Sequence, residues 1–161
     1  MEASPEFVIR RFEQKDLGSI MEINRTCLPE NYSASFFLDI HMKCPEGFLV
    51  ALKGDQVVGY IMCRLERSFS EISRFRLAKK GHIVSIAVLP EHRRKGLATR
   101  LVSEATKGLI DREAEECFLE VRISNRPAQE LYKRLGFQES RRIPFYYHNG
   151  EGATVMSKAL K

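Results

Sequence analysis

A basic run containing one glycine, residues 93–98, stands between a stretch typical of a strand and a stretch typical of a helix. Residues 82–88 before it are mostly apolar, and leucine and alanine recur at helical spacing through residues 97–109 after it. Backbone N–H groups at a helix start have no partner within the helix and lie at the positive end of its dipole, so they can hold a phosphate. The run therefore predicts a strand, a phosphate-binding turn and a helix in succession. A basic turn that merely begins a surface helix is the alternative.

A second segment downstream decides between these readings. Residues 93–98 fit the pattern R-x-x-G-x-A, and residues 125–137 fit N-x-x-A-x-x-L-Y-x-x-x-G-F. Together and in this order, the two patterns resemble those of the GNAT acyltransferase superfamily. The resemblance covers nearly the whole chain and implies one catalytic domain over residues 1–161. It also implies an α+β GNAT acyl-CoA N-acyltransferase fold, a mixed, mostly antiparallel sheet with splayed central parallel strands flanked by helices.

The resemblance implies acetyl-CoA as the cofactor and assigns residues to it. The backbone of Ile86, Ala87 and Val88 would pair with the pantetheine arm, and the turn and helix start would hold the pyrophosphate. The second segment would add Asn125, Lys133 and Arg134, together with Tyr132 as the general acid that protonates the departing thiolate. Asn125 would serve equally as a helix cap, and Tyr132 as a core residue. The expected pyrophosphate residues are Arg93, Arg94, Lys95, Gly96, Leu97, Ala98 and Thr99.

Two further segments resemble the acceptor-binding parts of archaeal and NatA-type N-terminal acetyltransferases. Leu28, Pro29, Glu30 and Tyr32 belong to a Leu-Pro-Glu-Asn-Tyr loop, which implies Glu30 as a base or orienting carboxylate and Tyr32 as a wall of the first-residue pocket. An ordinary loop between two helices is the alternative.

The second acceptor segment is Tyr146-Tyr147 followed by Gly150-Glu151, whose tyrosines would bind the substrate backbone. Exposed paired tyrosines at the edge of a simple hairpin are the alternative. The family usually continues Asp-Ala-Tyr, whereas this chain has Gly152-Ala153-Thr154. This departure leaves the shape of the acceptor pocket open.

His82 and Glu120 fall on neighbouring predicted strands. Related enzymes hold a water at these two positions that takes the amine proton, which is the first interpretation. A structural His–Glu hydrogen bond ranks second, and a divalent metal ranks third because two ligands make a poor site.

We predict strands at residues 7–12, 48–53, 56–64, 82–88, 117–122, 137–142 and 153–160, and helices at 17–28, 33–44, 97–109 and 125–135. Asp16 and Ser33 are the expected N-caps of the first two helices. Residues 66–80 fit either an extension of a hairpin or a mobile loop.

The composition and charge of the chain are compatible with several classes of function. The chain of 161 residues carries a formal charge of +5, which fits an anionic cofactor but also nucleic acid or a ribosome surface. Its four cysteines show no metal-binding or redox spacing, and no signal sequence or membrane span is recognisable, so we expect a soluble, cytoplasmic protein with no membrane partner. A nucleic-acid or ribosome-binding module would use Arg74, Arg76, Lys79 and Lys80, but this stretch lacks an aromatic-glycine motif, so nucleic acid is an improbable partner.

The protonation of amines favours an N-terminal acceptor. An α-amine with a pKa near ~7.8 is about a tenth neutral at pH 7, whereas a lysine near ~10.4 is neutral to less than about 0.1%. We therefore predict an enzyme that moves acetyl from acetyl-CoA to the free N-termini of nascent or mature proteins, by direct attack in a ternary complex. Starts with Ser, Ala or Met are expected, and association with a ribosome or an auxiliary subunit is open. The alternatives are a ribosomal-protein N-acetyltransferase of the RimI type and a small-molecule amine acetyltransferase.

Overall fold

The computed structural model of the chain describes residues 6–161. These residues form two compact units. The first comprises the described residues up to Leu65 together with Ile83–Arg112, and the second comprises Glu66–His82 together with Glu113–Lys161. Among the described residues, no helix combines the length and the apolar character needed to cross a bilayer.

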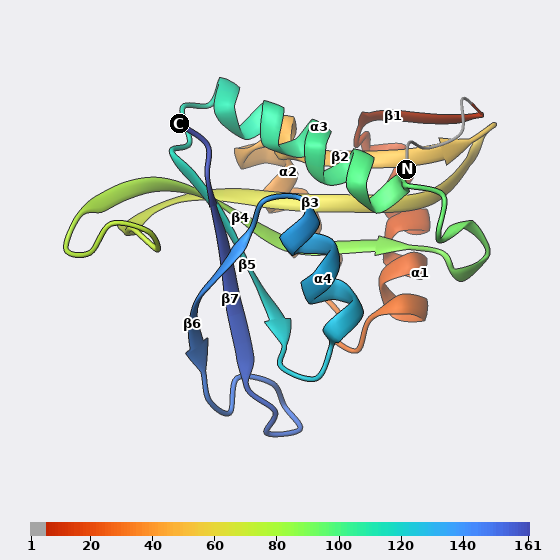
Figure 1. Cartoon of the computed structure of the whole chain (residues 1–161). Coiled ribbons are helices and arrows are strands. Elements are labelled where there is room, and N and C mark those ends of the chain that lie inside the picture. Colours follow the sequence, from red (N-terminus) through yellow and green to blue (C-terminus); the bar gives the residue numbers. More distant parts are fainter. Residues whose placement is uncertain (1–5) are drawn as a thin grey trace. The chain divides into compact units, whose positions relative to one another are not determined.

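The order of elements along the chain is the predicted one. The strands are β1 (Phe7–Arg11), β2 (Phe48–Lys53), β3 (Gln56–Phe69), β4 (Leu77–Val88), β5 (Glu116–Arg122), β6 (Gln138–Ile143) and β7 (Ala153–Ala159), as Figure 1 shows. The α-helices are α1 (Leu17–Cys27), α2 (Ala34–Lys43), α3 (Leu97–Asp111) and α4 (Arg126–Arg134).

Hydrogen bonds between neighbouring strands give the order β1-β2-β3-β4-β5-β7-β6. Strands β4 and β5 are parallel, whereas β1/β2, β2/β3, β5/β7 and β6/β7 are antiparallel. The parallel pairing joins only residues 80–82 to residues 116–118, as expected for strands that splay. The mixed, mostly antiparallel sheet with helices confirms the predicted α+β fold.

Aromatic and aliphatic side chains from helices α1 and α2, from strands β2, β3 and β4, and from Phe12 after β1 make the core of the first unit. Its members are Phe12, Ile20, Ile23, Phe37, Ile40, Phe48, Val50, Leu52, Val57, Tyr60, Met62 and Ala87. The rings of Phe12 and Phe48 stack with centroids 4.2 Å apart. Because burial of each such side chain contributes roughly 1.5–3 kcal/mol, this cluster holds α1 and α2 against β2 and β3.

Helix α3 buries the face that its sequence spacing predicts, with Leu97, Leu101, Ala105 and Leu109 all removed from solvent. A Cβ atom at Gly108 would lie 2.2 Å from the carbonyl oxygen of Glu46. Glycine is therefore required where α3 passes the short helix Pro45–Gly47.

In the second unit, β7 lies between β5 and β6, and α4 follows β5 along the chain. The N-cap of helix α4 is Asn125, whose side-chain oxygen accepts a hydrogen bond from the Ala128 N–H at 3.3 Å, and the helix ends before Gly136 at φ +96°. These are the signals that the sequence carries for a helix start and stop.

Residues 66–80 form the hairpin extension and not a mobile loop. Strand β3 continues to Phe69, β4 begins at Leu77, and the Ser70 N–H donates to the Arg76 carbonyl at 2.7 Å. Figure 1 shows this extension as the long yellow-green arm.

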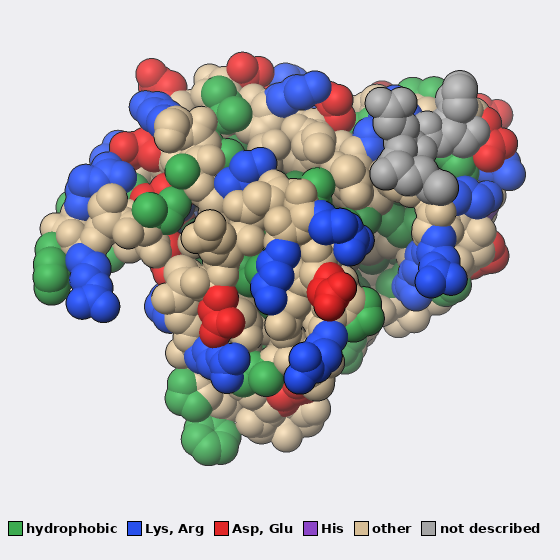
Figure 2. Space-filling view, viewed as in Figure 1, with side chains coloured by type: hydrophobic (Ala, Val, Ile, Leu, Met, Phe, Trp, Pro, Cys, Tyr) green, Lys and Arg blue, Asp and Glu red, His purple; other side chains and the backbone are tan. Residues whose placement is uncertain are grey.

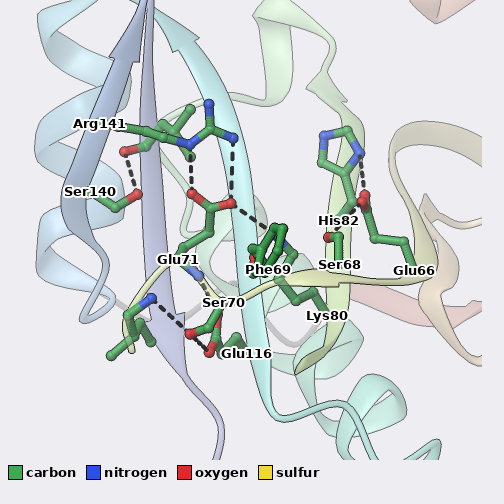
Figure 3. Close-up of polar contacts among 12 residues, drawn as sticks. Glu66, Ser68, Phe69, Ser70, Glu71, Lys80, His82, Glu116, Ser140 and Arg141 are labelled. Atoms are coloured by element: carbon green, nitrogen blue, oxygen red, sulfur yellow. Dashed lines mark hydrogen bonds and ion pairs between the residues drawn. The ribbon is translucent and has the colours of Figure 1, made fainter. Parts of the chain in front are cut away.

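Four side chains, which we call the Glu71 cluster, hold the turn of this extension: Glu71, Lys80, Glu116 and Arg141 (Figure 3). The Lys80 Nζ lies 2.8 Å from Glu71 Oε2, with the two side chains 3% and 6% exposed. Arg141 Nε donates to Glu71 Oε1 at 2.8 Å, and Glu116 accepts from the Ser70 hydroxyl and, at 2.9 Å, from the Glu71 N–H. No sequence motif marked this cluster, which orders a segment that composition alone left undecided.

One predicted cap is wrong. Asp16 makes no side-chain cap at α1; its carboxylate instead pairs with Arg10 at 2.8 Å and accepts from the Glu13 N–H at 2.8 Å. Asp16 stands at the N-cap position of α1, but it is also the last residue of a short 3-10 helix, Gln14–Asp16, and its carboxylate belongs to the capping box of that helix, whose N-cap is Glu13. The predicted cap at Ser33 is confirmed, because its hydroxyl accepts from the Phe36 N–H at 3.2 Å.

Candidate functional site

In the first unit, the end of β4 leads into the predicted phosphate turn. Gly96 is the N-cap of α3 at φ +78°, and Arg94 also has a positive φ, of 63°. No side chain caps α3, so its first N–H groups, those of Leu97, Ala98 and Thr99, have neither a helical carbonyl nor a capping side chain. A helix start of this kind fits an anionic group.

The cations of this turn differ in their surroundings. Arg93 Nε donates to the Val88 carbonyl at 2.8 Å, which ties the turn back to the end of β4. The Lys95 ammonium lies 5.6 Å from the centroid of the Phe7 ring. The Arg94 side chain is exposed on this turn.

The Leu28–Tyr32 segment follows α1 in the same unit, and its two ends, Leu28 and Tyr32, pack against the apolar core, as do Val84 and Leu89. The Tyr32 ring stacks on Phe36 with centroids 4.7 Å apart. Cys27, just before the loop, approaches the Val88 carbonyl with its sulfur at 3.8 Å. The structure thus brings the predicted acceptor loop beside the end of β4.

In the second unit, His82 and Glu120 contact each other directly, with Nε2 and Oε1 2.6 Å apart. The imidazole stacks on Phe118 at a centroid distance of 4.5 Å and is 8% exposed. This direct contact is the arrangement of the structural-pair interpretation.

The other imidazole nitrogen, Nδ1, is buried without a hydrogen-bond partner among the described residues. It lies 3.9 Å from Glu66 Oε1, and the contact is an ion pair only when the imidazole is protonated. Figure 3 shows the His82 and Glu66 side chains facing each other. Nδ1 is therefore the atom that could hold a water. Within residues 6–161, no three His, Cys, Asp or Glu side chains gather as metal ligands do, and the metal interpretation gains no support.

Helix α4 carries the predicted general acid. Tyr132 is buried, and its ring lies edge-on to Phe137 with centroids 5.8 Å apart. Asn125 caps the helix, the alternative that its position before Pro127 suggested. Lys133 and Arg134 are exposed on the last turn of α4, where cations also favour the helix dipole.

Tyr146 and Tyr147 lie in the turn between β6 and β7, with ring centroids 5.0 Å apart. The Arg122 guanidinium sits 4.0 Å from the centre of the Tyr147 ring and pairs with Glu151 at 3.3 Å. Glu151 also accepts from the Ser124 N–H at 2.8 Å, and hydrogen bonds from the side chain and then the backbone of Ser124 lower the pKa of its carboxyl. The turn is thus attached to the end of β5.

The departure from the family pattern at Gly152 has a steric reason in this chain. A Cβ atom there would lie 2.9 Å from the side chain of Ile123 and 3.1 Å from the carbonyl oxygen of Ile143. A larger residue requires those neighbours to move, so glycine fits the turn as it is built.

Three polar residues that sequence reasoning did not assign to the site lie beneath the acceptor loop. Asn24, Tyr60 and Ser85 are 1%, 0% and 6% exposed and are joined by hydrogen bonds. The one signal in the sequence was a polar Asn24 on the apolar face of α1.

The basic stretch proposed for nucleic acid is partly neutralised within the protein. Lys80 pairs with Glu71, and Arg76 lies 3.1 Å from Glu115. On the face shown in Figure 2, Lys and Arg side chains are spread among Asp and Glu and form no continuous stripe. These features favour a solvated surface over a nucleic-acid interface.

Comparison with known proteins decides the family. Residues 17–137 match the Acetyltransferase (GNAT) family. The chain belongs to this family. It is 45% identical over 157 residues to the N-alpha-acetyltransferase of Saccharolobus solfataricus, covering 96% of this chain and 94% of that protein. It is 38% identical to the N-terminal acetyltransferase A complex catalytic subunit NAA10 of Arabidopsis thaliana, covering 95% and 78%.

Solved structures agree with this family. Ard1 of Thermoplasma volcanium matches with a TM-score of 0.82 and 29% identity over 96% of this chain and 97% of that one. Naa50 of Arabidopsis thaliana, solved with the bisubstrate analogue CoA-Ac-MVNAL, matches with a TM-score of 0.80 and 25% identity over 95% and 98%. The ribosomal-protein-S18-alanine N-acetyltransferase of Escherichia coli, at 23% identity and a TM-score of 0.76 over 96% and 94%, shares the fold alone. The predicted family and the predicted acetyltransferase activity are confirmed.

Proposed function

We propose that this protein transfers acetyl from acetyl-CoA to the free α-amine of protein N-termini. The observation that carries this function is the Leu28–Tyr32 loop packed beside the end of β4, in a chain 45% identical over nearly its full length to an N-alpha-acetyltransferase. The ribosomal-protein alternative has weaker support, because that similarity reaches only the fold.

Acetyl-CoA supplies the acetyl thioester when bound. The uncapped start of α3, with Gly96 in a left-handed conformation, has the free N–H donors that its pyrophosphate requires. Arg93, Arg94, Lys95, Leu97, Ala98 and Thr99 complete that cradle, and the backbone of Ile86, Ala87 and Val88 orients the pantetheine arm. Asn125, Lys133 and Arg134 are further cofactor residues.

The acceptor N-terminus needs a binding site and a weak base that removes one proton from its amine. In the first unit, Leu28, Pro29 and Tyr32 would contact the first residue of the substrate. In the second unit, Tyr146 and Tyr147 would bind the substrate backbone. Glu30 would orient the amine, and a water on His82 Nδ1 would take its proton, with Glu120 holding the imidazole through Nε2. Weak bases suffice, because about a tenth of an N-terminal amine is already neutral at pH 7.

Tyr132 would donate the proton that the departing thiolate needs. Its phenol is the one buried ionisable hydroxyl that the family resemblance assigns on α4. An auxiliary subunit is a further proposal, supported by the similarity to a catalytic subunit of the N-terminal acetyltransferase A complex.

The function is tested by mass spectrometry after incubation with acetyl-CoA and peptides beginning Ser, Ala, Met-Leu or Glu. An N-terminally blocked peptide containing lysine is the control. We expect acetylation of free N-termini only, with Ser and Ala starts preferred. Tyr132→Phe is expected to lower kcat about 100-fold at unchanged affinity for CoA. Modification of the blocked lysine peptide alone, or of no peptide, contradicts the proposed function.

A further inference from the structure

The side chain of Asn24 is buried on α1 and uses all four of its hydrogen-bonding positions. Its Nδ2 donates to the Glu30 carbonyl at 3.1 Å and to the Tyr60 hydroxyl at 3.2 Å. Its Oδ1 accepts from the Tyr32 N–H at 3.3 Å and from Asn31 Nδ2 at 3.2 Å. A single side chain thus holds the backbone of the acceptor loop on both sides of Asn31, at the Glu30 carbonyl and at the Tyr32 N–H.

The orientation of this amide is determined by its neighbours. A backbone N–H can only donate and a carbonyl oxygen can only accept, so Oδ1 must face Tyr32 and Nδ2 must face Glu30. Aspartate, although of the same shape, would place an acceptor against the Glu30 carbonyl. Asparagine is therefore the residue that this position requires.

Tyr60 and Ser85 connect Asn24 to strand β4. The Tyr60 hydroxyl lies 2.6 Å from the Ser85 hydroxyl, and the Tyr60 ring is buried in the apolar core. Ser85 directly precedes Ile86, the first residue whose backbone is assigned to the cofactor. A continuous chain of hydrogen bonds thus runs from the backbone of Glu30 to β4.

We infer that Asn24, Tyr60 and Ser85 are positioning residues that fix the acceptor loop relative to the cofactor-facing end of β4. This inference rests on the proposed function and adds to it the residues that set where the acceptor amine is held. Tyr60 stays uncharged in this role, because burial raises its pKa to about 12. A loop held at both its carbonyl and its N–H loses little further freedom when a peptide binds, and the cluster should therefore lower the KM for the peptide.

Steady-state kinetics of Tyr60→Phe test this role, because phenylalanine keeps the ring and removes only the hydroxyl. The substitution removes two hydrogen bonds, to Asn24 and to Ser85. We expect the peptide KM to rise about tenfold, which corresponds to about 1.4 kcal/mol, with the KM for acetyl-CoA unchanged. Asn24→Asp is expected to raise it further. Ile23→Val, at the neighbouring buried position of α1, is the matched control and should leave both KM values unchanged. Equal changes in the two KM values, or none, overturn the inference.

Hydrogen exchange provides a readout that does not need activity. In Tyr60→Phe, the Tyr32 N–H should exchange about tenfold faster, while the N–H groups inside α1 keep their protection. Unchanged exchange at Tyr32 overturns the positioning role whether or not the enzyme is active. A wild-type protein that acetylates no N-terminal peptide contradicts the proposed function instead, so the two failures are distinguishable.

Discussion

Two buried polar clusters hold two different loops of this protein, and they are built from different chemistry. The cluster of Asn24, Tyr60 and Ser85 uses only neutral groups to hold residues 30–32. The Glu71 cluster uses buried charges to hold the turn of residues 70–76. Neutral groups are less costly to bury than ions, and they do not change their state between pH 3 and pH 9. The comparison teaches that the predicted acceptor loop is held independently of pH, whereas the hairpin turn depends on its buried charges, Lys80 and Glu71, remaining paired.

The largest effect that tests this comparison is the loss of a buried charge partner. Glu71→Ala leaves the Lys80 ammonium, 3% exposed, with the Phe69 carbonyl at 2.8 Å and the Phe118 ring but no carboxylate. We expect the free energy of unfolding, measured with urea, to fall by about 3 kcal/mol. Adding Lys80→Met should recover part of this loss. A loss below about 1 kcal/mol would show that the charges are not effectively buried.

Acid should destabilise the Glu71 cluster and leave the cluster of Asn24, Tyr60 and Ser85 unchanged. The loss of stability should be smaller than in Glu71→Ala, because protonation removes the charge of Glu71 but leaves its side chain in place. Burial by itself raises the pKa of this carboxyl, but hydrogen bonds from Arg141 and Lys80 outweigh it, and the pKa lies below its ordinary value. Its contribution to stability is therefore complete above the ordinary value of about 4.3 and is lost as the pH falls through the folded-state pKa.

Urea titrations between pH 7 and pH 3 check this dependence, with Glu71→Gln as the control. The wild type should lose more stability than the variant over this range. As the pH falls, the protection of the Glu71 N–H against hydrogen exchange should decrease more than the free energy of global unfolding does. The protection of the Tyr32 N–H should show no such additional decrease. Parallel pH profiles for the two proteins would contradict the difference between the clusters.

The smallest effect is expected at the edge of the Glu71 cluster. Arg141 bonds to Glu71 at 2.8 Å, but its side chain is 52% exposed, so water screens the pair. Arg141→Ala should lower the free energy of unfolding by about 0.5 kcal/mol, and added salt should reduce the difference. A loss near that of Glu71→Ala would place Arg141 at the centre of the cluster instead of its rim.

The parts of the fold that depend on local signals were predictable. The spacing of Leu97, Leu101, Ala105 and Leu109 predicted the buried face of α3, and Ser33 predicted the start of α2. The prediction that Asp16 caps α1 was wrong. A carboxylate near a helix start also pairs with any cation that the fold brings close, and here that cation is Arg10. Residues 66–80 stayed undecided because their order comes from Glu116 and Arg141, which are distant in sequence.

In the candidate site, too, some residues could be predicted from the sequence and others could not. Motifs marked the phosphate turn, the acceptor loop and the tyrosines, but no motif marked Tyr60 or Ser85, which sit in apolar stretches of their strands, residues 57–63 and 83–88. A hydroxyl in such a strand looks the same in sequence whether it faces a partner or not. Its role depends on which polar group from another element lies within about 3 Å.

The sequence by itself determined the order of strands and helices, the family and the glycine-containing turn at the start of α3. Each of these follows from spacing or from residues adjacent in the chain. Only the tertiary structure decided that Asn24 holds Glu30 and Tyr32, and that Lys80 and Glu71 form an ion pair buried from solvent. Hydrogen bonds and ion pairs act over a few ångströms, and the fold alone brings their partners within that range.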